Sequence, residues 1–175
     1  ESLRPRLDEF FDDHIHYLDH TPRGKQFDSD PGHLVPTDEQ IEDIRAIVDK
    51  YPDLEAGIAA AAACEQYASV ADFSLSHQEF LDDVLTNRAQ PFRNLARFFD
   101  WKMEALIAAG KSREAAELGL QMLRITRLRD NEPLLVNYLV NVAVRGIICQ
   151  GMDDALACGP IPPELHAKID EELAR

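Results

Sequence analysis

The sequence has few of the residues that build disulfide frameworks, zinc sites or β-sheets. It contains three cysteines, Cys64, Cys149 and Cys158, and no C-x-x-C pair, which argues against a structural zinc site. An odd number excludes full internal pairing. Cys149 and Cys158 could pair, but we expect buried free thiols. β-branched residues are sparse, whereas Ala, Leu, Glu, Asp and Arg are plentiful, and this composition favours helices.

The motifs of common catalytic sites are also absent. The sequence contains no G-x-S-x-G, no P-loop, no G-x-G-x-x-G and no H-E-x-x-H. Cys64 lies in an alanine-rich segment, where a thiol usually serves as inert packing. The sequence therefore predicts a protein that is not an enzyme and that needs no cofactor.

Positive charge and long apolar runs are scarce as well. The chain has 18 basic and 32 acidic residues, a formal net charge of −14. Such a surface repels phosphate backbones, so we expect no nucleic-acid partner. No run reaches the roughly 18 apolar residues of a membrane span. The longest candidate, residues 133–151, is interrupted by Asn137, Asn141 and Arg145, so we expect no direct membrane insertion by this segment.

The sequence does have helical periodicity along most of its 175 residues, a length that fits one domain. Two capping boxes mark helix starts, Thr37 with Gln40 and Ser76 with Glu79. Pro91 predicts a break in the helical pattern. In chain order we expect a helix over 2–20, a long loop over 20–36, a helix from 37 that ends before Pro52, and a helix over 54–68. Next we expect a helix from 76 to a break at 87–91, followed by helices over 91–109, 112–129 and 133–149, with Gly151 closing the last of these. A final helix is expected within 160–175.

These segments predict an all-α, single-domain helical bundle of about six to seven helices over residues 1–175. Residues 1–71 would hold the amino-terminal helices and the long loop, and residues 72–175 a hairpin-centred core. Gly110 ends one apolar helix and Ser112 caps the next after a very short loop, so the two helices must run antiparallel.

This hairpin is similar to the second half of a tetratricopeptide unit, with Gly110 and Ala115 at the characteristic places. Gly151 and Ala155 repeat the pattern faintly. The two glycines are 41 residues apart, whereas that repeat has a period of about 34 residues, and no third copy precedes them. We therefore expect a bundle with one tetratricopeptide-like hairpin rather than a repeat array.

Asp12, His16, Asp19 and His20 are the candidate metal ligands. They lie at i, i+4, i+7 and i+8 of the first predicted helix and so share one face. Imidazole and carboxylate groups at this spacing can bind zinc or another divalent cation. The alternative, which we favour, is an exposed polar face of an amphipathic helix.

Asn137, Asn141 and Arg145 are the candidate ligand-binding residues. They form a polar line at i, i+4 and i+8 on an otherwise apolar helix. One interpretation is a pocket wall that recognises a carboxylate, with the arginine as anchor. The other, which we favour, is the narrow solvent-facing side of a nearly buried helix, whose polar groups could also form hydrogen bonds to neighbouring helices.

From about residue 72 to its end the chain resembles a group of uncharacterised helical proteins of planctomycete bacteria. The resemblance covers roughly 60% of the sequence and is carried by "FRNLARFFDWKMEALIAAGKSREAAELGLQMLRITR" (92–127), "EPLLVNYLVNVAVRGI" (132–147) and "CGPIPPELHAKIDEELAR" (158–175). It implies export and a membrane anchor upstream of Glu1, and otherwise a cytoplasmic location is expected. It implies no activity.

Three functional hypotheses follow. The leading one is a non-enzymatic protein-interaction or scaffold domain of an exported, membrane-anchored protein, with another protein as partner. The second is a metal- or small-ligand-binding protein that uses the face of His16 and His20. The third is a regulatory helical protein that forms oligomers through an exposed apolar stripe.

Overall fold

The computed structural model describes residues 3–20, 36–67, 72–130 and 134–174, and all regular structure within these ranges is helical, which confirms the all-α prediction. Counting α5, η1 and α6 as one continuous run, the described residues form seven helices. The elements are α1 (Arg4–His20), α3 (Asp38–Val48), α4 (Pro52–Ala62), α5 (His77–Asp82), the π-helix η1 (Asp83–Ala89), α6 (Gln90–Ala108), α7 (Ser112–Leu128), α8 (Leu135–Cys158) and α9 (Pro163–Leu173).

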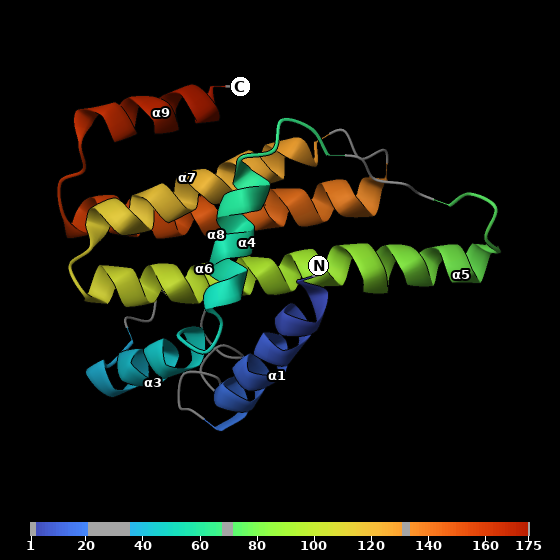
Figure 1. Ribbon diagram of the computed structural model, residues 1–175, viewed down its shortest axis with the longest axis horizontal. Coiled ribbons are helices and arrows are strands. Elements are labelled where there is room, and N and C mark those ends of the chain that lie inside the picture. The colour runs from blue at the N-terminus through green and yellow to red at the C-terminus, as the bar shows by residue number, and fades with distance from the viewer. Residues whose placement is uncertain (1–2, 21–35, 68–71, 131–133, 175) are drawn as a thin grey trace.

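The predicted hairpin is present. α6 and α7 run side by side in opposite directions, and α8 packs against both of them (Figure 1). Gly110 forms the corner with a φ of 71°, a backbone conformation that glycine adopts without steric cost. The predicted Ser112 cap is wrong. Ser112 is the first residue of α7 and is buried, and Lys111 precedes the helix without a side-chain cap.

α8 is longer than predicted, because Gly151 does not end it. A Cβ atom at residue 151 would lie 3.0 Å from Cε of Met103 on α6, so this glycine marks a close contact within the bundle. Gly119 of α7 has the same role, since its Cβ would lie 2.5 Å from Cγ of Met152. The two glycines let α7 and α8 approach their neighbours, and α8 continues to Cys158.

The helical run also continues through Pro91, where we predicted a break. Proline lacks the N–H that would bond to the carbonyl four residues earlier. The π-helix η1 lies directly before it, and the N–H of Gln90 donates to the carbonyl of Leu85, five residues back. This wider turn accommodates the proline without ending the helix.

The amino-terminal helices pack against the hairpin. α1 and α3 both contact α6, whereas α4 contacts α7 (Figure 1). Both predicted capping boxes are present, at Thr37–Gln40 before α3 and at Ser76–Glu79 before α5. α4 ends at Ala62, short of the predicted residue 68, and the loop predicted from 20 to 36 lies almost wholly outside the described residues.

The cysteines differ from expectation. All three are free and exposed, so the prediction of buried thiols is wrong, and Cys149 does not pair with Cys158. The core consists instead of aliphatic and aromatic side chains from α1, α3, α4, α6, α7, α8 and α9.

Candidate functional site

The candidate metal ligands lie on α1. Asp12, His16 and Asp19 are exposed, and the side chain of His20 lies outside the described residues. Among the described residues, no group of three or more His, Cys, Asp or Glu side chains is close enough to hold a metal ion. The sequence analysis did not single out His14, which is buried with its ring centroid 4.4 Å from that of Trp101. This contact places His14 in the core.

The polar line on α8 faces the interior of the bundle. Asn137 and Asn141 are each only 2% exposed, and Arg145 is partly exposed at the edge of the same face. The solvent-facing part of the interpretation that we favoured from the sequence is therefore wrong for the two asparagines, whose side chains lie inside the bundle. The hydrogen bonds to a neighbouring helix that it allowed are present for Asn141 and Arg145.

Hydrogen bonds tie two members of this line to the end of α7. The Nδ2 atom of Asn141 donates to the carbonyl oxygen of Thr126 at 2.9 Å and to Oδ1 of Asp130 at 2.8 Å. Arg145 donates through Nε to Oγ1 of Thr126 at 3.2 Å and through Nη2 to Oδ2 of Asp130 at 2.6 Å. The carboxylate of Asp130 therefore binds the guanidinium of Arg145 at the place where a ligand carboxylate would have to bind.

Asn137, one helical turn earlier, is different. Neither its Nδ2 nor its Oδ1 atom has a hydrogen-bond partner among the described residues. A buried amide without partners costs about 1–3 kcal/mol. The three residues therefore do not form one ligand-binding set, because two are used within the fold and the third faces the packed interior.

A small hollow of about 200 Å³ opens beside Arg145, between α7, α8 and α9. Its charged side chains are paired within the hollow. Arg145 bonds to Asp130, and Arg127 forms an ion pair with Glu172 at 2.7 Å without hydrogen-bond geometry. Ligand pockets usually measure about 300–1,000 Å³ and hold a few polar groups free for the ligand. This hollow fits neither description.

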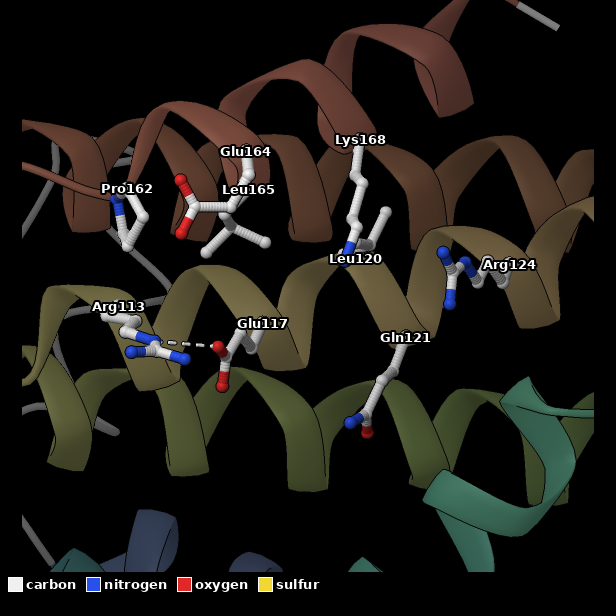
Figure 2. A pocket seen from close by; sticks show the side chains of 9 residues that line it. All are labelled: Arg113, Glu117, Leu120, Gln121, Arg124, Pro162, Glu164, Leu165 and Lys168. Carbon is white, nitrogen blue, oxygen red and sulfur yellow. Dashed lines mark hydrogen bonds and ion pairs between the residues drawn. The ribbon is translucent and has the colours of Figure 1, made fainter.

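A second hollow of about 260 Å³ lies between α7 and α9 (Figure 2). Lys168 and Glu164 reach from α9 toward α7, where Arg113 and Glu117 bond to each other at 2.8 Å. Charges of both signs line it, so it offers no dominant charge to select a ligand. It is a shallow groove between two helices.

The side of α8 that faces away from the bundle is apolar. We call it the outer face of α8 and define it by Leu135, Tyr138, Leu139, Val142, Gly146 and Cys149. Leu135, Tyr138, Leu139 and Val142 expose between 49% and 72% of their surface. Ile147, on its flank, is also exposed. The first half of α8 thus buries Asn137 and Asn141 together with Val144 while it exposes large apolar side chains, unlike an ordinary surface helix.

The outer face also lacks charge. Between Leu134 and Met152 the only charged residue is Arg145, whose guanidinium binds Asp130. In the whole chain, by contrast, 29% of the residues are charged. This face could not be located from the sequence, because α8 is apolar on nearly all sides and periodicity does not indicate which side is buried.

α8 is also long and apolar enough, by length and composition alone, to cross a membrane. It has 24 residues and so measures about 36 Å. The core helix of a water-soluble bundle passes the same test, and the inward residues of α8 are packed against α6 and α7.

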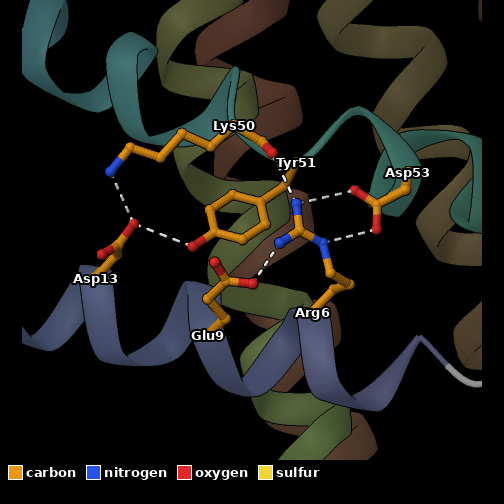
Figure 3. A network of polar contacts seen from close by, with 6 residues as sticks. All are labelled: Arg6, Glu9, Asp13, Lys50, Tyr51 and Asp53. Carbon is orange, nitrogen blue, oxygen red and sulfur yellow. Dashed lines mark hydrogen bonds and ion pairs between the residues drawn. The ribbon is translucent and has the colours of Figure 1, made fainter.

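A polar network joins α1 to the junction of α3 and α4 (Figure 3). The guanidinium of Arg6 donates to Asp53 at 2.9 and 3.3 Å and to the carbonyl oxygen of Lys50 at 2.8 Å, and it also pairs with Glu9. Its Cζ atom lies 4.6 Å from the centroid of the Tyr51 ring. These groups bond to one another, which makes the network a clamp between helices.

Asp13 and Tyr51 form the other half of the network. Oδ2 of Asp13 accepts hydrogen bonds from Nζ of Lys50 and from the hydroxyl of Tyr51, both at 3.0 Å. The bond from Lys50, followed by that from Tyr51, lowers the pKa of Asp13 despite partial burial. Burial, together with the bond to Asp13, raises the pKa of the Tyr51 hydroxyl, which therefore remains a donor.

This clamp predicts a pH dependence of stability. Because the pKa of Asp13 is lower in the folded state than its ordinary value of 3.8, its contribution is fully present above that value and is lost as the pH falls through the folded pKa. We expect Asp13→Asn to unfold at a lower urea concentration than the unchanged chain near pH 7, and this difference to vanish in strong acid. Urea titrations across the acid range measure it. Lys50→Gln, which removes one of the hydrogen bonds to Asp13, should reduce the difference between the Asp13→Asn variant and its parent. A difference that persists in strong acid would contradict the role of the Asp13 carboxylate in the clamp.

Compared with models of known protein families, with curated proteins and with solved structures, the chain matches none.

Proposed function

We propose that this chain is a protein-interaction domain that presents the outer face of α8 to an apolar surface of a partner protein. The proposal rests on the burial pattern of α8. Asn137 and Asn141 are buried, whereas Leu135, Tyr138 and Leu139 are exposed. A face of this kind is costly in water and is typical of interaction sites.

The arrangement favours a helix as the bound element. Leu135, Leu139, Val142, Gly146 and Cys149 follow one another at alternating steps of four and three residues. This spacing produces a straight apolar seam along a helix, of the kind that packs against a second helix. The packing of α8 on α6 and α7 presents the seam on a fixed support.

This proposal has three further parts. They are a non-enzymatic role, the tetratricopeptide-like nature of the hairpin, and an exported, membrane-anchored location. The hairpin around Gly110 supports the second point. The resemblance to helical proteins of planctomycete bacteria supports the third. An anchored domain meets partners that are held near the same membrane, so a modest interaction surface suffices.

Photo-crosslinking tests the proposal. We expect a benzoylphenylalanine in place of Tyr138, which is 57% exposed, to form a discrete covalent adduct with one protein in cells of the source organism. The same group in place of Asp43, an exposed residue of α3, serves as the control and should give no such adduct. Mass spectrometry of the adduct identifies the partner.

A second substitution links the adduct to the face. Val142→Asp places a charge at the middle of the outer face, where a half-exposed side chain can be replaced without opening the core. It should abolish the adduct at residue 138 while circular dichroism remains that of the folded chain. An adduct that survives Val142→Asp, or no discrete adduct at residue 138, overturns the proposal.

A further inference from the structure

Gly146 lies on the outer face and has no role in packing against the part of the chain that the structure describes. A Cβ atom at this position would have no neighbour within 4 Å among the described residues, whereas a Cβ at Gly119 or Gly151 would meet a methionine side chain. Glycine within a helix costs about 1 kcal/mol relative to alanine. The presence of glycine at this exposed helix position is explained if a second molecule packs closely against the backbone there.

The outer face is complementary to itself when a second copy of α8 runs in the opposite direction. With Val142 opposite Val142 of the second copy, the seam spacing places Leu139 opposite Gly146 and Leu135 opposite Cys149. Leu135 and Leu139 thus each face a smaller residue, and the space above Gly146 receives a leucine. Such an isologous contact repeats every pair twice about one axis.

The parallel alternative is less favourable. It would place Gly146 opposite Gly146, which leaves a void, and Asp153 opposite Asp153, which brings like charges together. In the antiparallel arrangement Asp153 lies beyond the first residue of the partner's α8.

Charge does not select a basic partner for the outer face, because the face carries no charge with which such a partner could pair. The chain carries a net charge of −14, so two copies repel each other outside this face, and the contact between them depends on its apolar side chains alone.

From these observations we infer that the outer face of α8 binds the outer face of α8 in a second copy of this chain, antiparallel and centred on Val142. This inference rests on the proposed function and names the partner. Four large side chains of the outer face are each about half or more exposed, and a contact between two such helices covers at most about 1,000 Å² in total, the lower end for a specific interface. The dimer is therefore weak and in exchange with the monomer.

A compensating pair of substitutions tests the register. In analytical ultracentrifugation, we expect Gly146→Leu to weaken dimerisation about tenfold because it opposes two leucines, and Leu139→Ala to weaken it similarly because it leaves a gap. The double variant Leu139→Ala with Gly146→Leu restores a large residue opposite a small one and should dimerise nearly as tightly as the unchanged chain. Both positions are exposed, so the folded state of each monomer is preserved.

Salt provides an independent readout. Because the two copies repel each other outside the outer face, raising the ionic strength should strengthen the dimer. Binding through opposite charges would weaken under the same change.

The remaining outcomes separate this inference from the proposed function. A chain that stays monomeric at all concentrations, while benzoylphenylalanine at residue 138 captures a different protein, overturns the dimer and leaves the proposed function standing. Dimerisation that is unchanged or tightened by Gly146→Leu overturns the antiparallel register. A monomer that floats with phosphatidylcholine vesicles, and loses this property on Val142→Asp, overturns the dimer and identifies a membrane as the occupant.

Discussion

Replacing Phe10 by alanine is expected to lower the free energy of unfolding by about 3–5 kcal/mol. Phe10 is fully buried, and its ring lies edge-to-face with those of Tyr51, Phe98 and Trp101 at centroid distances of 5.7, 5.3 and 5.9 Å. It therefore joins α1 to the α3–α4 junction and to α6. A cavity here removes apolar burial and three aromatic contacts at once.

Urea unfolding followed by circular dichroism measures this loss. Because domains of this size are stable by only about 5–15 kcal/mol, the variant should be close to the limit of folding at 37 °C. Phe73→Ala is the matched control. Phe73 is 73% exposed and contacts Phe80 at a centroid distance of 5.5 Å, so its removal should cost less than about 1 kcal/mol. Equal losses in the two variants would contradict the assignment of Phe10 to the core.

Replacing Asn137 by leucine is expected to raise the free energy of unfolding by about 2 kcal/mol. Leucine has the same branching as asparagine, and its two methyl groups take the places of the amide oxygen and nitrogen. The substitution removes two buried polar atoms that have no partner among the described residues and adds apolar burial. A stabilising change at a buried polar residue is uncommon, so its sign is informative.

The same substitution one turn later should have the opposite effect. Asn141→Leu removes the two hydrogen bonds from Nδ2 to Thr126 and Asp130 and leaves those acceptors without this donor. We expect it to lower the free energy of unfolding by about 1–3 kcal/mol. Thermal or urea unfolding of both variants, under identical conditions, measures the contrast. A destabilised Asn137→Leu would mean that the amide of Asn137 has partners in solution.

Several features of the fold could be predicted from local sequence. The capping boxes at Thr37 and Ser76 are local patterns, because a side chain and a backbone N–H three residues apart satisfy each other wherever the helix packs. Gly110 is equally local, because its positive φ ends α6 whatever surrounds it. Both follow from bonding over a few residues.

Other features depended on neighbours that are distant in sequence. α1 carries phenylalanine at both residue 10 and residue 11. The packing of α1 on α6 buries Phe10, while Phe11 lies under the guanidinium of Arg97 at 5.1 Å. Pro91 looked like a break because sequence patterns give no sign of the preceding π-helix. Gly151 looked like a helix end because Met103, which accounts for it, belongs to another helix.

The amino-acid sequence by itself determined that the described chain is helical, where most helices begin and that α6 and α7 form a hairpin, because propensity, caps and turn geometry act within a few residues. Tertiary structure decided which side of α8 is outside. α8 is apolar on nearly every side, so its orientation depends on its neighbours. Val144, Ile148 and Met152 enter the core, and on the same side Thr126 and Asp130 offer acceptors to Asn141 and Arg145. This packing and these hydrogen bonds turn the polar line inward, and the apolar outer face is the consequence.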